Sequence, residues 1–247
     1  MESVASVRIA GFQVQSSRRE QLAQQLLQGI AAQRKQILFF ANTNFIVKCR
    51  PLLERIAAAP VTLVNDGVGM DIASKLIAGG RFEQNLNGTD FVPYLFSQAA
   101  GQNGQPLRVF MIGSTAEVLE KASRHVQTQL GQQVVGVCDG FGGVRDIEAL
   151  NAQLLAARPD VVLVAMGNPL QEEWILRHYA GVPASLFIGV GALFDFWSGG
   201  KSRAPRAVQA MRLEWLYRLM LEPRRLLRRY TWDILVFLGV CYRYRQH

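Results

Sequence analysis

Short apolar runs alternate with longer stretches of helical periodicity along the first 200 residues. The apolar runs are rich in Val, Ile, Leu and Phe and are bounded by turn residues. They are Ile37–Ala41, Val61–Val64, Leu107–Ile112, Val134–Val137, Val161–Met166 and Ser185–Val190. Runs this short and this continuously apolar are typical of strands that are buried on both faces of a sheet.

The segments between these runs repeat apolar residues at helical spacing. The predicted helices are Ile46–Ala58, Met70–Ala78, Phe91–Ala100, Ala116–Leu130, Ile147–Ala157 and Gln171–Tyr179. An opening strand over Val7–Val14 and a helix over Arg18–Arg34 precede them. Strands and helices that alternate in this way predict an α/β fold, with a mostly parallel sheet covered by helices on both faces.

The pattern changes after residue 200. Pro205 can start a helix, and Met211–Leu221 repeats apolar residues at helical spacing until Pro223 ends it. Arg224–Tyr244 is predicted to form a further helix that contains the apolar run Ile234–Val240. That run is too short to span a bilayer, so it either lies at a membrane surface or packs on the body of the protein.

Charge separates the same two parts of the chain. The 247 residues carry a formal net charge of +8, and 49% of them are hydrophobic, enough for a sizeable core. Residues 201–247 hold 11 of the 27 Lys+Arg and 3 of the 19 Asp+Glu, whereas residues 1–200 hold 16 of each. A neutral body with a basic C-terminal part indicates an anionic partner: nucleic acid, an acidic membrane surface or a phosphorylated substrate.

Metal and disulfide chemistry have little support in the sequence. Cys49, Cys138 and Cys241 lie far apart and form no CxxC pair, so they are expected to be reduced and buried. There is also no DxD element and no pair of histidines at ligand spacing, so neither a metal nor a cofactor is expected. The N-terminus lacks the charged and apolar regions of a signal peptide, and no apolar run approaches the roughly 18 residues of a membrane span.

Polar residues and glycines follow the predicted strands. Because ligands of a parallel sheet bind outside the carboxyl ends of its strands, these residues predict a site along one edge. They are Asn42–Asn44, Asn65–Gly67, Gly113–Thr115, Cys138–Gly140, Gly167–Asn168, Gly191 and Asp195. The chain has neither a GxGxxG turn in its first βα unit nor a Walker lysine, which argues against an ordinary dinucleotide or nucleoside triphosphate site.

Asp66 is the best candidate for a general base. It lies in the sequence VNDGVG between a predicted strand and a helix. A carboxylate there can accept a proton from a hydroxyl nucleophile, but it can also cap the helix that follows, and the local sequence alone slightly favours the cap. His125 and His178 are both predicted within helices, away from the strand ends, so a Ser-His-Asp arrangement has no support.

Three sequence blocks resemble the WecG/TagA/CpsF glycosyltransferases. The run GVGALFDFWSGGKSRAP and the following LEWLYRLMLEPRRLLRRY are similar to the C-terminal half of that family, and Gly167–Glu172 resembles its GxPxQE stretch. The resemblance covers nearly the whole chain. It implies a Rossmann-like core over residues 1–200 and a basic helical appendage over residues 201–247 that completes the active site and contacts the membrane.

The resemblance also implies an activity. Family members are inverting enzymes that transfer a sugar from a UDP-sugar to a polyprenyl-diphosphate-linked saccharide in bacterial cell-surface or exopolysaccharide synthesis. They are cytoplasmic, associate peripherally with the inner membrane face and are not thought to need a catalytic metal. For this chain the resemblance implies a UDP-sugar donor, a lipid-linked acceptor and the inner membrane surface as partners, and no nucleic acid. Whether the protein forms a homo-oligomer is left open.

Site residues carry over by position. Asp66 resembles the general base, and Thr43 its neighbour in the catalytic pocket. The arginines Arg218, Arg225 and Arg228 resemble those that close over the diphosphate, where bidentate guanidinium groups neutralise a leaving group. Phe141 matches an aromatic residue near the nucleotide. The remaining expected substrate-binding residues are Asn44, Gly113, Gly167, Gln171 and Asp195.

One position departs from the family pattern. Asn85 stands where members usually carry Arg, five residues before the Asp of the GxD element, here Asp90. The departure makes a neutral hexose donor such as UDP-glucose an alternative to UDP-N-acetylmannosamine or its uronic acid. From the residues alone, a basic nucleic-acid-binding module and an NAD-dependent nucleotide-sugar enzyme are weaker alternatives, because no matching motif accompanies them.

Overall fold

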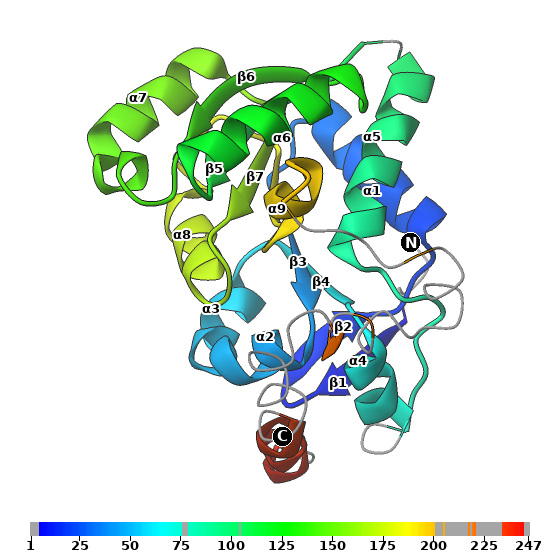
Figure 1. Ribbon diagram of the computed structural model, residues 1–247. Coiled ribbons are helices and arrows are strands. Elements are labelled where there is room, and N and C mark those ends of the chain that lie inside the picture. The colour runs from blue at the N-terminus through cyan, green and yellow to red at the C-terminus, as the bar shows by residue number, and fades with distance from the viewer. Residues whose placement is uncertain are drawn as a thin grey trace.

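A mostly parallel β-sheet forms the centre of the molecule (Figure 1). The computed structural model describes residues 5–75, 79–103, 105–200, 205, 217, 219–220 and 234–244. Within these residues the sheet has eight strands in the order β1-β2-β4-β3-β8-β7-β5-β6. Their bounds are β1 Ser6–Ile9, β2 Phe12–Gln15, β3 Gln36–Ala41, β4 Val61–Asn65, β5 Arg108–Gly113, β6 Gln133–Cys138, β7 Val161–Ala165 and β8 Leu186–Gly189. Only β1 pairs antiparallel, with β2.

Helices cover both faces of the sheet, so the predicted Rossmann-like α/β architecture is confirmed. One face carries α1 Arg19–Ala31, α5 Gly88–Asn103, α6 Ala116–Thr128 and α9 Leu193–Trp197. The other carries α2 Thr43–Lys48, α3 Leu53–Ala58, α4 Val68–Ala73, α7 Ile147–Ala157 and α8 Leu170–His178. Side chains of β3 alternate between the two apolar clusters, since Phe39 belongs to one and Phe40 to the other.

The expected first strand, Val7–Val14, is wrong: the segment is the hairpin of β1 and β2. Ala10 and Gly11 form the turn, and both have positive φ, 50° and 85°. Two consecutive residues in the left-handed region are typical of a hairpin turn that matches the twist of the strands. In the sequence, Val7 and Ile9 alternate with polar residues up to this turn, and the alternation starts again at Phe12. This interruption is the sequence signal for the hairpin.

Two other elements differ from expectation. The predicted helix Ile46–Ala58 is divided into α2, a 3-10 turn η1 (Arg50–Leu52) and α3, because Pro51 lacks the N–H that a continuous helix needs. Strand β6 lies at the edge of the sheet and leaves Val137 43% exposed, so it is not buried on both faces. Helix α9 was not predicted.

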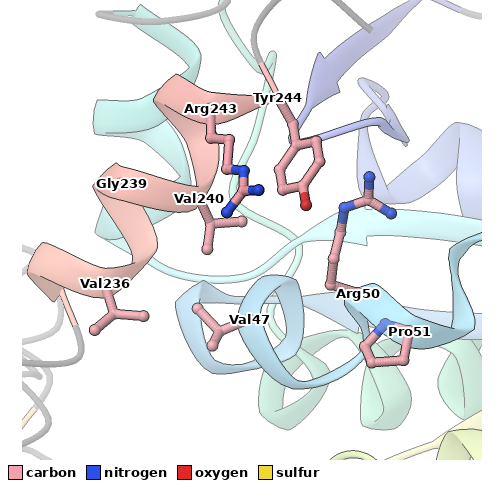
Figure 2. Close-up of a pocket in the computed structure, with 8 residues that line it drawn as sticks. All are labelled: Val47, Arg50, Pro51, Val236, Gly239, Val240, Arg243 and Tyr244. Atoms are coloured by element: carbon pink, nitrogen blue, oxygen red, sulfur yellow. The ribbon is translucent and has the colours of Figure 1, made fainter.

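Residues 234–243 form a helix, which we call the C-terminal helix. Phe237 and Cys241 on one side of it are buried in the core cluster, while Leu235 and Tyr242 are 62% and 76% exposed. The helix lies beside α2 and η1 (Figure 2). It therefore packs on the body and still presents apolar side chains to solvent.

The rest of the predicted appendage falls mostly outside the described residues, including most of the helix expected over Met211–Leu221. Of that segment, Tyr217, Leu219 and Met220 are helical. In the described part of the chain no helix has the length and apolarity that crossing a membrane requires. The three cysteines are free and buried, as expected.

Candidate active site

Asp66 lies at the carboxyl edge of the sheet beside Asn42. Asp66 directly follows β4, and Asn42 directly follows the neighbouring β3. The last residues of these strands, Ala41 and Asn65, are register partners, so Asn42 and Asp66 lie next to each other. The Asn42 side-chain amide donates to Asp66 Oδ2 at 3.4 Å, and Asn42 Oδ1 accepts from the backbone N–H of Phe45 at the start of α2. Asn42 therefore caps α2 and orients the half-buried carboxylate at once.

The interpretation of Asp66 as the cap of the next helix is wrong. The N-cap of α4 is Gly67, with φ 92° and no side-chain capping bond. The Gly67 N–H instead donates to Asn85 Oδ1 at 2.8 Å. Asn85, the departure from the family pattern, thus holds the turn that carries Asp66.

Thr43 reaches the same place from α2. A Cβ built on Gly69, in the first turn of α4, would lie 2.5 Å from Thr43 Cγ2. Only glycine fits against Thr43 at this distance, so the beginnings of α2 and α4 are close together. The structure therefore brings Thr43 and the Asp66 turn to one point of the sheet edge.

A chain of side-chain hydrogen bonds links this point to the end of β7. Asn44 donates to Asn168 Oδ1 at 3.1 Å, and Asn168 donates to Glu172 Oε1 at 2.7 Å. Gln171 Nε2 also donates to Glu172 Oε1 at 2.7 Å, and the Cys49 thiol donates to Oε2 at 3.5 Å. Glu172 is fully buried, and this burial raises its pKa.

Gln171 holds the turns at the ends of two adjacent strands. Its Oε1 accepts from the backbone N–H of Gly167 after β7 at 3.3 Å and of Gly191 after β8 at 2.9 Å. The side chain is 4% exposed. The side-chain amide of Gln171 therefore makes its hydrogen bonds within the protein. A contact of Gln171 or Gly167 with the nucleotide stays a prediction.

We expect Glu172→Gln to change how stability depends on pH. Because the pKa of Glu172 is higher in the folded than in the unfolded protein, its protonated form stabilises the fold fully below about pH 4.5. This contribution to the free energy of unfolding is lost as the pH rises toward the folded-state pKa. In that window the free energy of unfolding of the wild type should fall relative to the variant by about 1.4 kcal/mol per pH unit. Urea unfolding from pH 4 to 8 measures this, and a difference that is independent of pH would contradict it.

A cavity of about 390 Å³ opens at the ends of β5, β6 and β7. It is lined by Ser114, Gly140, Phe141, Val144, Ala165, Met166, Leu170, Glu173, Trp174, Arg177 and His178. Gly113 has φ 115°, and a Cβ there would lie 2.3 Å from the Ala165 carbonyl oxygen. Its lack of a side chain lets the turn before α6 close against β7.

The loop after β6 places Phe141 at the rim of this cavity. The Asp139 carboxylate accepts from the backbone N–H groups of Phe141, Gly142 and Gly143 at 2.7 to 3.0 Å. These bonds lower the pKa of Asp139. Phe141 itself is 67% exposed, so its ring is available to a ligand.

Sequence reasoning missed the wall that α8 contributes. Trp174, Arg177 and His178 come from one face of this helix. Their spacing of three and four residues is the sequence signal that places them on the same face. Trp174 Nε1 is buried without a hydrogen-bond partner among the described residues. The His178 ring is tilted by 36° against that of Trp174, with ring centroids 4.9 Å apart, and burial lowers the pKa of His178. One histidine therefore does line the cavity, from the last turn of α8.

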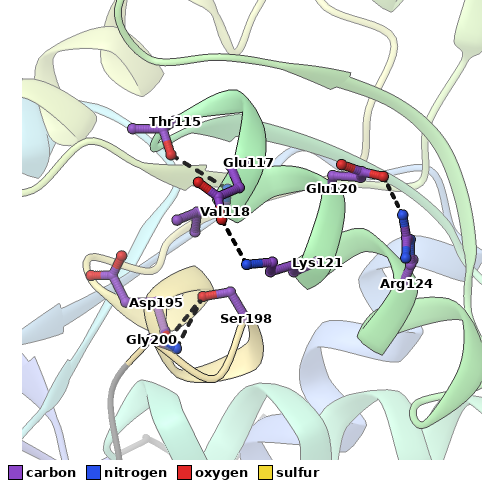
Figure 3. A network of polar contacts seen from close by, with 9 residues as sticks. All are labelled: Thr115, Glu117, Val118, Glu120, Lys121, Arg124, Asp195, Ser198 and Gly200. Carbon is purple, nitrogen blue, oxygen red and sulfur yellow. Dashed lines mark hydrogen bonds and ion pairs between the residues drawn. The ribbon is translucent and has the colours of Figure 1, made fainter.

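Asp195 comes from α9, which packs against α6. Figure 3 shows it near the start of α6, where Thr115 caps the helix by accepting from the Val118 N–H at 3.4 Å. Ser198 Oγ donates to the Asp195 carbonyl oxygen at 3.0 Å and closes the end of α9. Asp195 does not line the 390 Å³ cavity.

Two further expectations concern the arginines of the appendage and a metal site. Arg218, Arg225 and Arg228 lie outside the described residues. Across the described ranges, no group of three or more His, Cys, Asp or Glu side chains is arranged to hold a metal ion.

The edge of the sheet thus carries a half-buried carboxylate at β4 and a cavity at β5 to β7, joined by the hydrogen-bonded turns of β3, β7 and β8. Comparison with protein-family models matches residues 7–247 to one family, described as the glycosyl transferase WecG/TagA/CpsF family. The match spans nearly the whole chain and includes both parts of this edge. The chain belongs to the WecG/TagA/CpsF family of glycosyltransferases.

Proposed function

We propose that the protein is an inverting glycosyltransferase that moves a sugar from a UDP-sugar to a polyprenyl-diphosphate-linked saccharide. The observation that carries the proposal is the Asp66 carboxylate, which is half-buried, oriented by Asn42 and fixed on a turn that Asn85 holds. Inversion in one step needs one base on the acceptor side and stabilisation of charge on the leaving group. The arrangement along the sheet edge offers a place for each.

The donor is proposed to occupy the cavity at the ends of β5 to β7. Phe141 stands at its rim, where a ring can stack on the uracil base. The turn of Gly113 leads into the N-terminus of α6, whose N–H groups favour phosphate. From the appendage, Arg218, Arg225 and Arg228 are proposed to close over the diphosphate.

The reaction then needs a single displacement. Asp66 accepts the proton of the acceptor hydroxyl, and the hydroxyl oxygen bonds to the anomeric carbon from the face opposite UDP. The bond from that carbon to the diphosphate oxygen breaks, and UDP leaves with the electron pair. The appendage arginines neutralise the departing diphosphate without a metal ion.

The proposed donor is a UDP-sugar that carries a neutral hexose, such as UDP-glucose. Asn85 is short, uncharged and engaged with the Gly67 N–H, so it offers no cation beside Asp66 for a carboxylate or phosphate. UDP-N-acetylmannosamine and its uronic acid are the alternative donors. The lipid-linked acceptor would bring the enzyme to the inner face of the cytoplasmic membrane as a peripheral protein in exopolysaccharide or cell-surface polysaccharide synthesis.

Phe141→Ala should raise the KM for the UDP-sugar about tenfold with a smaller change in kcat, because a stacked base contributes about 1–3 kcal/mol. Initial rates over a range of donor concentrations measure this. Leu155→Ala is the matched control, since Leu155 on α7 is 56% exposed and does not line the cavity. An unchanged KM in the Phe141 variant would place the base elsewhere.

A panel of UDP-sugars with a synthetic polyprenyl-diphosphate glycoside tests the proposed function. The expected result is transfer from one donor with a neutral sugar, UDP-glucose being the proposed one, in preference to the negatively charged UDP-N-acetylmannosaminuronic acid. Transfer from none of the UDP-sugars, with transfer from another class of nucleotide sugar, would overturn the donor assignment.

A further inference from the structure

A second pocket, of about 660 Å³, lies between the C-terminal helix and the α2–η1 segment (Figure 2). Its walls are largely apolar and include Val47 of α2 and Val240 of the C-terminal helix. Two arginines, Arg50 and Arg243, also line it, one from each side. A pocket that combines apolar walls with two cations suits an anion that carries an apolar tail.

The two guanidinium groups share one aromatic ring. The Cζ atom of Arg50 lies 4.1 Å from the centre of the Tyr244 ring, and that of Arg243 lies 5.8 Å from it. Figure 2 shows the ring between the two arginine side chains. Both distances fall within the range of cation–π attraction, which holds the guanidinium groups without neutralising them.

Neither arginine has a carboxylate partner in the part of the chain that the structure describes. No ion pair joins Arg50 or Arg243 to a described Asp or Glu, and the described lining residues include no acid. Two cations that line one pocket and have no described acidic partner suit the oxygens of a phosphate group.

We propose that this pocket binds the phosphate of an acidic membrane phospholipid. Arg50 and Arg243 contact the phosphate, and the valines contact the first part of the acyl chains. The exposed Leu235 and Tyr242 on the same helix can then enter the interfacial region of the bilayer. The proposal rests on the membrane location in the proposed function and gives it a defined lipid site on the folded body.

Gly239 offers a way to block the pocket without changing charge. It lines the pocket, and a Cβ placed on it would meet no atom within 4 Å. Leucine at this position fills the space and favours the helix more than glycine does. Gly239→Leu should therefore fold, keep both arginines and add apolar surface, and yet bind lipid more weakly.

The test is flotation of the full chain with vesicles at about 0.15 M salt. Vesicles of phosphatidylcholine are compared with vesicles that contain about one-third phosphatidylglycerol. The wild type should bind the acidic vesicles preferentially. Each charge near an anionic surface contributes about fivefold, so Arg50→Gln with Arg243→Gln should weaken binding about 25-fold. Gly239→Leu should weaken it about fivefold or more, and thermal melts confirm folding.

Arg34→Gln is the matched control, because Arg34 is exposed at the opposite edge of the sheet, before β3. The proposal is overturned by equal binding to both vesicles, by an equal loss in the Arg34 variant, or by undiminished binding of Gly239→Leu. It is also overturned if inorganic phosphate binding, but not vesicle binding, depends on Arg50, since the site would then take free anions. Flotation needs no transfer reaction, so failure here leaves the glycosyltransferase assay to judge the proposed function separately.

Discussion

Asp66→Asn should lower the rate of sugar transfer by about 10²–10⁴-fold while the protein folds normally. Asparagine keeps the shape of the side chain and leaves an oxygen that can still accept the 3.4 Å hydrogen bond from Asn42. It has no basic group for the proton of the acceptor hydroxyl. Steady-state kinetics with the lipid-linked acceptor should therefore show a loss in kcat, with little change in the KM for the donor.

Asp146→Asn is the control for this variant. Asp146 caps α7 by accepting from the Ala149 N–H at 3.0 Å and stands outside the proposed site. It should retain full turnover. If Asp66→Asn turned over at a rate near that of the wild type, Asp66 would not be the base, and another group along the edge would have to take the proton.

Gly113→Ala is expected to lower the free energy of unfolding by about 2–5 kcal/mol. The added Cβ would lie 2.3 Å from the carbonyl oxygen of Ala165, on a neighbouring central strand. Backbone atoms of two paired strands can move little, and the φ of 115° is unfavourable for alanine. Urea unfolding followed by circular dichroism measures the loss.

Gly131→Ala separates the two causes of that loss. Gly131 also has positive φ, 63°, but a Cβ there would meet no atom within 4 Å. This variant should lose only about 1–2 kcal/mol, from the backbone conformation alone. Equal losses in the two variants would show that close packing at Gly113 contributes nothing.

The sequence was sufficient for the six strands β3 to β8 and for the edge at which the polar residues gather. Apolar runs such as Val161–Met166 differ sharply from the helical periodicity around them, because a strand buried on both faces tolerates no polar position. The β1–β2 turn and the break at Pro51 were visible in the sequence as Ala10–Gly11 and as the proline itself. Both depend on local backbone restraints that override the broader pattern.

Long-range hydrogen bonding accounts for most of what could not be predicted in the site. Nothing near Asn85 in the sequence indicates that its side chain accepts from the Gly67 N–H, 18 residues away. Likewise Glu172 is in the sequence only the last residue of the stretch Gly167–Glu172, although in the fold it joins Asn168, Gln171 and Cys49. Such contacts arise when neighbouring strands bring distant turns together.

The C-terminal part combines two interpretations that the sequence left open. Phe237 and Cys241 pack in the core, as expected for a helix on the body, while Leu235 and Tyr242 remain exposed as an interfacial helix requires. Removal of residues 201–247 would therefore also uncover the core. Single substitutions are better suited to separate catalysis, lipid binding and folding.

The most direct test of an inverting mechanism with Asp66 as the base is the anomeric configuration of the product, read from its proton coupling constants by nuclear magnetic resonance. With an α-linked UDP-sugar and a polyprenyl-diphosphate glycoside, the wild type should form a β-linked product. Asp66→Asn should form almost none under the same conditions. An α-linked product would contradict this mechanism, because retention requires a double displacement or an equivalent route that a single base at Asp66 does not provide.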